Sequence, residues 1–151
     1  MVGRMLSSTM TPIFTHHLEV RFRDCDPMGH VNNAVYLTYL EQARFAQWRA
    51  LWGFSEQPVP GNRTSAPGII LARVEIDYRK PARYGDRLEI RIGLAGIGRS
   101  SFTYEYDIVD TGGAVVAVAR SVQVMYDYAL GHPVPVPDDM RQKLTGTSPG
   151  A

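Results

Sequence analysis

Residues 24–52 read DCDPMGHVNN followed by AVYLTYLEQARFAQWRALW, and this stretch decides the fold. Pro27 and Gly29 supply the chemistry of a tight turn, and Asn32 or Asn33 can cap a helix by accepting a backbone amide hydrogen bond. Apolar residues then recur at helical spacing to about residue 52. A carboxylate on the turn would therefore face the exposed amides of a helix N-terminus across a short gap.

The predicted helix is apolar around most of its circumference. One face carries Val35, Tyr36, Tyr39, Leu40, Ala43, Ala46 and Ala50, while further apolar bulk lies elsewhere at Leu37, Phe45, Trp48 and Leu51. This is more than a surface helix normally carries, so we expect the rest of the protein to wrap around the helix. At three-residue spacing, Glu41 and Arg44 are expected to form an ion pair on the helix surface.

Alternating residues predict one strand before the helix and four after it. Residues 14–23 alternate as a half-buried strand, and the later strands fall near residues 72–79, 87–94, 101–108 and 116–126. In the last strand, the predicted core face comprises Val116, Val118, Val122, Val124 and Tyr126, with Arg120 interrupting it. Short turns favour antiparallel hairpins between these later strands.

Composition limits the protein to one ordinary domain. The chain has 151 residues, is 44% hydrophobic and carries a net charge of +1, which favours neither nucleic acid nor an acidic membrane surface. Cys25 is the only cysteine, and no apolar run is long enough for a signal peptide or a membrane span, so we expect a cytoplasmic protein.

The chain divides into three expected segments: an N-terminal extension at 1–13, a domain at 14–138 and a tail at 139–151 that is disordered at its end. Within the domain, we expect a Pro- and Gly-rich loop at 54–68.

Two aspartates lie on the turn, and each has a structural and a chemical interpretation. Asp26 precedes Pro27 and can accept backbone amides of the turn, or it can serve as an acid or nucleophile. For Asp24 we favour a structural role, as a turn cap or a partner of Arg21 or Arg23.

The histidines of the N-terminal half also have structural explanations. His30 can be satisfied by hydrogen bonds to the backbone, or it can support the reaction by orienting the substrate or by pairing with the carboxylate. His16 and His17 point to opposite faces of one strand, so we expect no metal site there, and no cofactor.

The segment from Arg21 to Arg44 resembles the 4-hydroxybenzoyl-CoA thioesterase-like acyl-CoA thioesterases. The resemblance rests on Asp24-x-Asp26-Pro27-x-Gly29-His30-Val31-Asn32-Asn33, then Tyr36-Leu37 and Glu41-Gln42-Ala43-Arg44, with a weaker element at Gly98-Arg99-Ser100-Ser101-Phe102. It covers about residues 14–138. It implies an α+β hotdog fold, in which a curled five-stranded antiparallel sheet wraps around one long central helix, and hydrolysis of acyl-CoA thioesters.

The resemblance also implies roles for individual residues. Asp26 falls at the position of the catalytic aspartate, a nucleophile or general base, and the backbone amide of Asn33 falls where an amide contacts the thioester oxygen. His30 would support the reaction, and Gly68 would present another amide. From the residues themselves, Tyr36 lies on the dense face of the helix, where we expect it to pack, and it could line the acyl pocket. Arg99 and Ser100 would bind the phosphates of coenzyme A, for which the basic cluster Arg79, Lys80 and Arg83 is an alternative.

Oligomer formation follows from the same resemblance, which implies a homodimer or homotetramer with sites at subunit interfaces. We expect a long sheet edge, such as the strand from Val116 to Val124, to pair with another copy. Two other functions remain open from the sequence: hydrolysis of acyl carrier protein thioesters, and non-catalytic binding of acyl-CoA.

Overall fold

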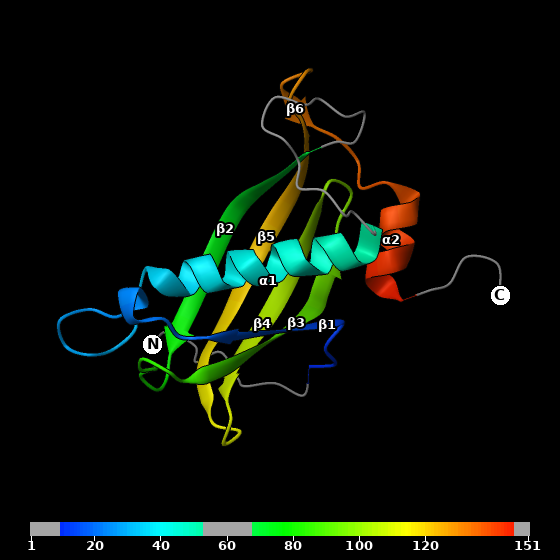
Figure 1. Cartoon of the computed structure of the whole chain (residues 1–151). Helices are drawn as coiled ribbons and strands as arrows, with labels where there is room; N and C mark the ends of the chain where they lie inside the picture. The colour runs from blue at the N-terminus through cyan, green and yellow to red at the C-terminus, as the bar shows by residue number, and fades with distance from the viewer. Residues whose placement is uncertain (1–9, 53–67, 147–151) are drawn as a thin grey trace, which may run out of the picture.

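The computed structural model describes residues 10–52 and 68–146. One long helix, α1, crosses one face of an antiparallel sheet, and this arrangement confirms the predicted hotdog fold (Figure 1). The elements in chain order are β1 (Phe14–Glu19), η1 (Phe22–Asp24), α1 (Val35–Trp52), β2 (Gly68–Tyr78), β3 (Arg87–Ile97), β4 (Ser101–Asp110), β5 (Val115–Asp127), β6 (His132–Pro133) and α2 (Asp138–Thr145). The two-residue β6 adds a sixth strand to the five that were predicted.

The order of the strands corrects the predicted sheet edge. The sheet runs β1-β3-β4-β5-β2, so β5 lies inside it, between β4 and β2, and cannot pair with another copy as we expected. The strand after α1 crosses over to pair with β5, for example through Val74 opposite Ser121. In the described part of the chain, the edges of the five-strand path are therefore β1 and β2.

The core face of β5 also differs from the prediction. Ala119 lies opposite Tyr106 and Ser121 lies opposite Tyr104, so the odd-numbered residues share the buried face with the aromatic residues of β4. Arg120 instead points to the outer face, where it forms an ion pair of 2.7 Å with Glu105. Both faces of β5 carry small or branched apolar residues, and for this reason alternation alone could not distinguish them.

The first strand is shorter than predicted. It ends at Glu19, and Phe22 lies in the η1 turn with 80% of its surface exposed, packed edge-on against Tyr84. The turn forms because the carboxylate of Asp24 accepts a hydrogen bond of 2.9 Å from the backbone amide of Arg21. A side chain that satisfies a backbone amide in this way competes with continuation of the strand.

Helix α1 is covered on one side within a single chain. Its buried residues are Tyr36, Tyr39, Leu40, Ala43 and Gln47. Leu37 and Phe45 on the opposite side remain 42% and 60% exposed, so the predicted wrapping of the helix is incomplete. The predicted Glu41–Arg44 pair is absent from the described ion pairs, because Arg44 donates a hydrogen bond of 3.3 Å to the hydroxyl of Tyr106.

The far end of α1 is covered by α2, which is longer than the single turn expected near Met140. Met140 and Leu144 are fully buried, and Lys143 Nζ donates a hydrogen bond of 3.0 Å to the carbonyl of Leu51. Most of the predicted loop at 54–68 and the end of the predicted disordered tail lie outside the described residues. None of the described helices is long and apolar enough to cross a bilayer.

Candidate active site

Asp26 lies on a tight turn that its own carboxylate helps to hold. Its Oδ1 accepts the amide of Met28 at 2.9 Å and that of His30 at 3.4 Å, while its backbone amide donates to the carbonyl of His30 at 2.8 Å. Gly29 sits at φ 84°, a conformation that favours glycine. Oδ1 therefore fills the predicted structural role, and Oδ2 has no hydrogen bond to any residue that the structure describes.

The start of α1 is capped by the first of the two asparagines. Asn32 Oδ1 accepts the amide of Ala34 at 2.9 Å, and the carbonyl of Asn32 accepts the amide of Val35 at 2.9 Å. The carbonyl of Asn33 accepts the hydroxyl of Tyr78 at 2.9 Å, whereas the Asn33 amide donates to no residue in the described ranges. An unpaired amide at the positive end of a helix is suited to bind a developing negative charge.

A cleft of about 270 Å³ brings four of the predicted residues together. Its lining includes Asp26, His30, Asn33 and Tyr36, with Val31, Tyr78, Arg79, Lys80 and Pro81 completing it. Asp26 and His30 are half-buried, and Tyr36 is buried. The side chain of Tyr36 also has a structural role, since its hydroxyl accepts the amide of Ala82 at 3.3 Å.

Asp24 has the structural role that we favoured from the sequence. It is 2% exposed, forms an ion pair of 2.9 Å with Arg21, and accepts a hydrogen bond of 2.7 Å from the hydroxyl of Tyr39. Burial by itself would raise the pKa of this carboxyl group, but the hydrogen bonds from Arg21 and Tyr39 outweigh burial and hold the pKa below its ordinary value. Asp24 is therefore ionised and fully committed to the fold.

The other predicted binding residues lie at the opposite end of the sheet. Gly68 pairs with Tyr126, while Tyr78, at the other end of β2, pairs with Ala117. Tyr78 lies ten positions beyond Gly68 along the strand, which corresponds to roughly 30 Å. The turn between β3 and β4 lies at the Gly68 end of the sheet (Figure 1). A single chain therefore does not bring Gly68, Arg99 or Ser100 to Asp26.

Two residues of the cleft were missed or underrated in the sequence. Tyr78 lies within the strand predicted near residues 72–79 and was given no role, yet its hydroxyl ties the end of β2 to the start of α1. Arg79 was only an alternative phosphate ligand, yet it lines the cleft, and its buried Nη2 has no hydrogen-bond partner in the described structure. The only sequence signal for either residue is its position at the end of a predicted strand, where functional residues are often found.

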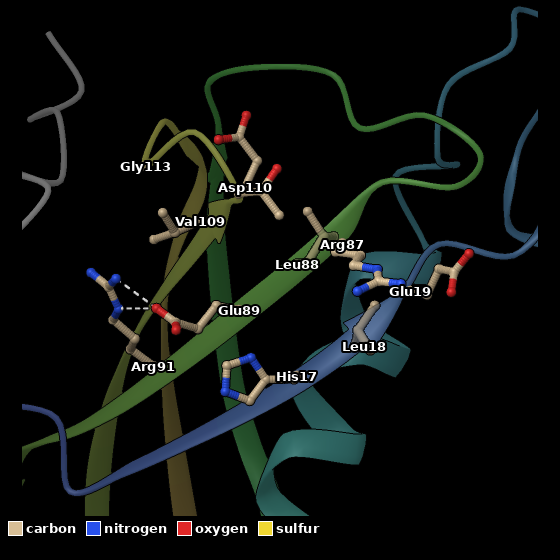
Figure 2. Close-up of a pocket in the computed structure, with 11 residues that line it drawn as sticks. His17, Leu18, Glu19, Arg87, Leu88, Glu89, Arg91, Val109, Asp110 and Gly113 are labelled. Carbon is tan, nitrogen blue, oxygen red and sulfur yellow. Dashed lines mark hydrogen bonds and ion pairs between the residues drawn. The ribbon is translucent and has the colours of Figure 1, made fainter.

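A larger cleft of about 670 Å³ lies between β1, β3 and the turn that joins β4 to β5. Figure 2 shows His17, Glu19, Arg87, Glu89 and Arg91 along it, with Glu89 and Arg91 paired to each other at 2.6 Å. None of the residues predicted for catalysis or binding lines this cleft, so we assign the candidate site to the smaller one. In the part of the chain that the structure describes, no three His, Cys, Asp or Glu side chains gather to hold a metal ion.

Comparisons with known proteins give one consistent result. A family model described as the thioesterase-like superfamily matches residues 20–144. The chain is 30% identical over 130 residues to the long-chain acyl-CoA thioesterase FadM of Escherichia coli, covering 84% of this chain and 93% of FadM. It is 29% identical over 129 residues to the 1,4-dihydroxy-2-naphthoyl-CoA hydrolase of Synechococcus elongatus, covering 85% and 93%.

A solved structure extends this similarity to the fold. A thioesterase from Thermus thermophilus, determined in complex with coenzyme A and zinc, superimposes on this chain with a TM-score of 0.73 at 32% identity. The superposition covers 90% of this chain and 94% of the other.

Proposed function

Because this chain belongs to the thioesterase-like superfamily, we propose that it hydrolyses acyl-CoA thioesters to the free acid and coenzyme A, with Asp26 as the reacting carboxylate. One observation carries the proposal. Asp26, with one oxygen free of hydrogen bonds to the described residues, and Asn33, with an unpaired backbone amide at the start of α1, line the same small cleft. A base or nucleophile and an oxyanion donor are the two groups that acyl transfer needs.

The reaction can proceed by either of two balanced routes. In the first, Asp26 Oδ2 attacks the thioester carbon, the carbonyl electrons move to oxygen, and collapse of this intermediate expels the thiolate of coenzyme A, which then takes up a proton. Water hydrolyses the mixed anhydride and regenerates Asp26. In the second, Asp26 removes a proton from a water molecule as that water attacks the same carbon; the tetrahedral intermediate then expels the thiolate of coenzyme A, which takes up the proton held by Asp26. In both routes the Asn33 amide stabilises the charge on the carbonyl oxygen.

Neighbouring residues of the cleft would orient the Asp26 carboxylate and the Asn33 amide. His30 lines the cleft beside Asp26, where its imidazole can orient the carboxylate or the attacking water. Tyr78 donates to the carbonyl of Asn33 and so restrains the residue whose own amide is the proposed oxyanion donor. Tyr36 forms part of the wall against which the acyl group would pack.

We propose that binding of coenzyme A requires a second copy of the chain. The two groups of predicted site residues lie at opposite ends of β2, and β2 is an edge strand. Antiparallel pairing of β2 with its own copy about a twofold axis would set the Gly68 end of one copy beside the Tyr78 end of the other. Gly68, Arg99 and Ser100 of one copy would then complete the cleft of the other.

Exposed apolar side chains support this arrangement. Leu71 and Tyr78 on β2, and Leu37 and Phe45 on α1, are each between 42% and 60% exposed in one chain. A second copy would cover them and would complete the wrapping of α1 that the sequence predicts.

We also propose that the protein is located in the cytoplasm. Acyl-CoA as substrate and Cys25 as the only cysteine of the chain are both consistent with this location.

Release of free thiol from a panel of short, medium, long and aryl acyl-CoA thioesters tests the function. We expect wild-type turnover on at least one member, and for Asp26→Asn a folded protein with nearly all turnover lost. Tight acyl-CoA binding without thiol release would indicate a non-catalytic protein, and faster turnover of acyl carrier protein thioesters would indicate that alternative substrate. Full activity of Asp26→Asn would exclude the assigned role of Asp26.

A further inference from the structure

Arg79 is the cation of the cleft that the proposed mechanism does not use. It follows β2 directly, and its backbone amide is fixed by a hydrogen bond of 2.9 Å to the carbonyl of Val116. Of the two long basic side chains in the cleft lining, Lys80 forms an ion pair with Asp110. Arg79 forms no ion pair with any residue in the described part of the chain.

The guanidinium group of Arg79 has an unmet requirement. Its Nη2 is buried and has no hydrogen-bond partner within the described residues. A buried donor without a partner is costly and rare in native structures, and a charged one more so, because it has lost water without gaining an acceptor. This donor and the unpaired amide of Asn33 belong to residues of the same cleft.

We infer that Arg79 is a second oxyanion donor, which binds the thioester carbonyl oxygen together with the Asn33 amide. This inference rests on the proposed function. When the carbonyl carbon is attacked, negative charge moves from the attacking oxygen onto the carbonyl oxygen, so a guanidinium hydrogen bond to that oxygen strengthens as the transition state forms. Such an interaction raises turnover and has little effect on binding of the ground-state thioester.

Two features favour the carbonyl oxygen over the phosphates of coenzyme A as the acceptor. Arg79 lines the cleft that holds Asp26, the group that must reach the thioester carbon, whereas Arg99 and Ser100, the residues predicted to bind the phosphates, lie at the opposite end of the sheet in the same chain. The hydroxyl of Tyr78, the residue just before Arg79, bonds to the carbonyl of Asn33. Arg79 therefore follows a residue that is hydrogen-bonded to Asn33, the residue whose amide is the first oxyanion donor.

Steady-state kinetics of Arg79 variants on two substrates test this role. The substrates are an acyl-CoA that the wild-type protein hydrolyses and the matching S-acyl-pantetheine, which lacks the phosphates. We expect Arg79→Met to lower kcat by roughly 100-fold on both substrates with KM changed by less than about threefold, and Arg79→Lys to lower kcat by about tenfold. Arg87→Met is the matched control, because Arg87 is an exposed arginine of the same sheet that does not line the cleft, and it should keep wild-type kcat.

The other outcomes each overturn the inference. Wild-type kcat in Arg79→Met, or a defect in KM that disappears with the pantetheine thioester, would mean that Arg79 is not an oxyanion donor. A loss of activity that accompanies dissociation or unfolding, measured by light scattering and circular dichroism, would mean that its role is structural. If Arg79→Met does not fold, Arg79→Gln replaces it, and a folded glutamine variant with wild-type kcat overturns the inference.

The wild-type protein separates this inference from the function on which it rests. If the wild-type chain releases no thiol from any thioester, the proposed function and the role of Arg79 fail together. If it is active and the Arg79 variants match it, only the role of Arg79 fails.

Discussion

The hydroxyl of Tyr39, a residue of α1, donates a hydrogen bond of 2.7 Å to Oδ2 of Asp24, and both residues are buried. Arg21 donates to both oxygens of Asp24, its Nη2 to Oδ1 at 2.9 Å and its backbone amide to Oδ2 at 2.9 Å, so both oxygens are occupied. Asp26, two residues later, keeps one oxygen free of hydrogen bonds to the described residues. One short turn thus carries a carboxylate that maintains the structure and one that is available for chemistry.

Tyr39→Phe should lower stability without changing the chemistry of the cleft. Removing the donor leaves a buried carboxylate with one hydrogen bond fewer, at a cost of about 2 kcal/mol in the free energy of unfolding. Urea denaturation followed by circular dichroism measures this cost. Tyr84→Phe is the matched control, since Tyr84 is 66% exposed, and it should change the free energy of unfolding very little.

The same variant should change the response to acid. The pKa of Asp24 is lower in the folded than in the unfolded protein, so its contribution to stability is complete above the ordinary pKa and is lost as the pH falls through the lowered one. Removing the Tyr39 hydrogen bond raises the folded pKa, so acid unfolding of Tyr39→Phe should begin at a higher pH than in the wild type. An unchanged acid midpoint would show that Tyr39 does not stabilise the ionised form.

Local sequence predicts the elements of this fold well because their determinants are local. The turn at Pro27 and Gly29, the cap at Asn32 and the spacing from Tyr36 to Ala43 each act within a few residues. The end of β1 was missed, because the capping of Arg21 by Asp24 competes with the alternation that continues to Phe22.

Tertiary relationships were less accessible from the sequence. Which face of β5 is buried depends on its register against Tyr106, and which strand forms an edge depends on the crossover that pairs β2 with β5. The separation of Gly68 from Asp26 follows from that crossover. The sequence alone therefore did not predict that the site residues would lie in two groups at opposite ends of the sheet.

Tyr78→Phe should reduce turnover through Asn33. Without the phenol hydroxyl, the Asn33 carbonyl loses its hydrogen bond of 2.9 Å, and the adjoining amide is less firmly placed. We expect kcat to fall about tenfold because small errors in placement are costly in acyl transfer, while the free energy of unfolding changes by less than about 1 kcal/mol. Tyr128→Phe serves as the control, as Tyr128 is exposed and lies outside the cleft lining.

Ala72→Pro should prevent self-association while the single chain stays folded. Ala72 lies at the register shift between Leu71 and Arg73, where it is left out of the pairing with β5. Proline is tolerated at bulges and edges, yet it removes a backbone donor and disturbs pairing with an incoming strand. Light scattering should therefore report an oligomer for the wild type and a monomer for Ala72→Pro. A variant that remains dimeric would rule out pairing through β2.

Mixing two inactive variants tests whether each site is shared between copies. Asp26→Asn removes the reacting carboxylate, and Arg99→Gln removes a proposed phosphate ligand at the other end of the sheet. In a mixed dimer one site would combine Asp26 of one copy with Arg99 of the other and would be intact, and the second site would carry both defects. Random exchange of subunits in equal amounts makes half of the dimers mixed, and one of the two sites in each mixed dimer is intact. About a quarter of wild-type sites should therefore return.

Mixing Asp26→Asn with an Asp26→Asn,Arg99→Gln double variant is the control, because no combination of those chains restores a carboxylate. Thiol release at a low acyl-CoA concentration, before and after exchange, measures the recovery. If each chain used its own Arg99, neither mixture would gain activity, and the shared site would have to be abandoned even though the Asp26 cleft could remain the centre of the chemistry.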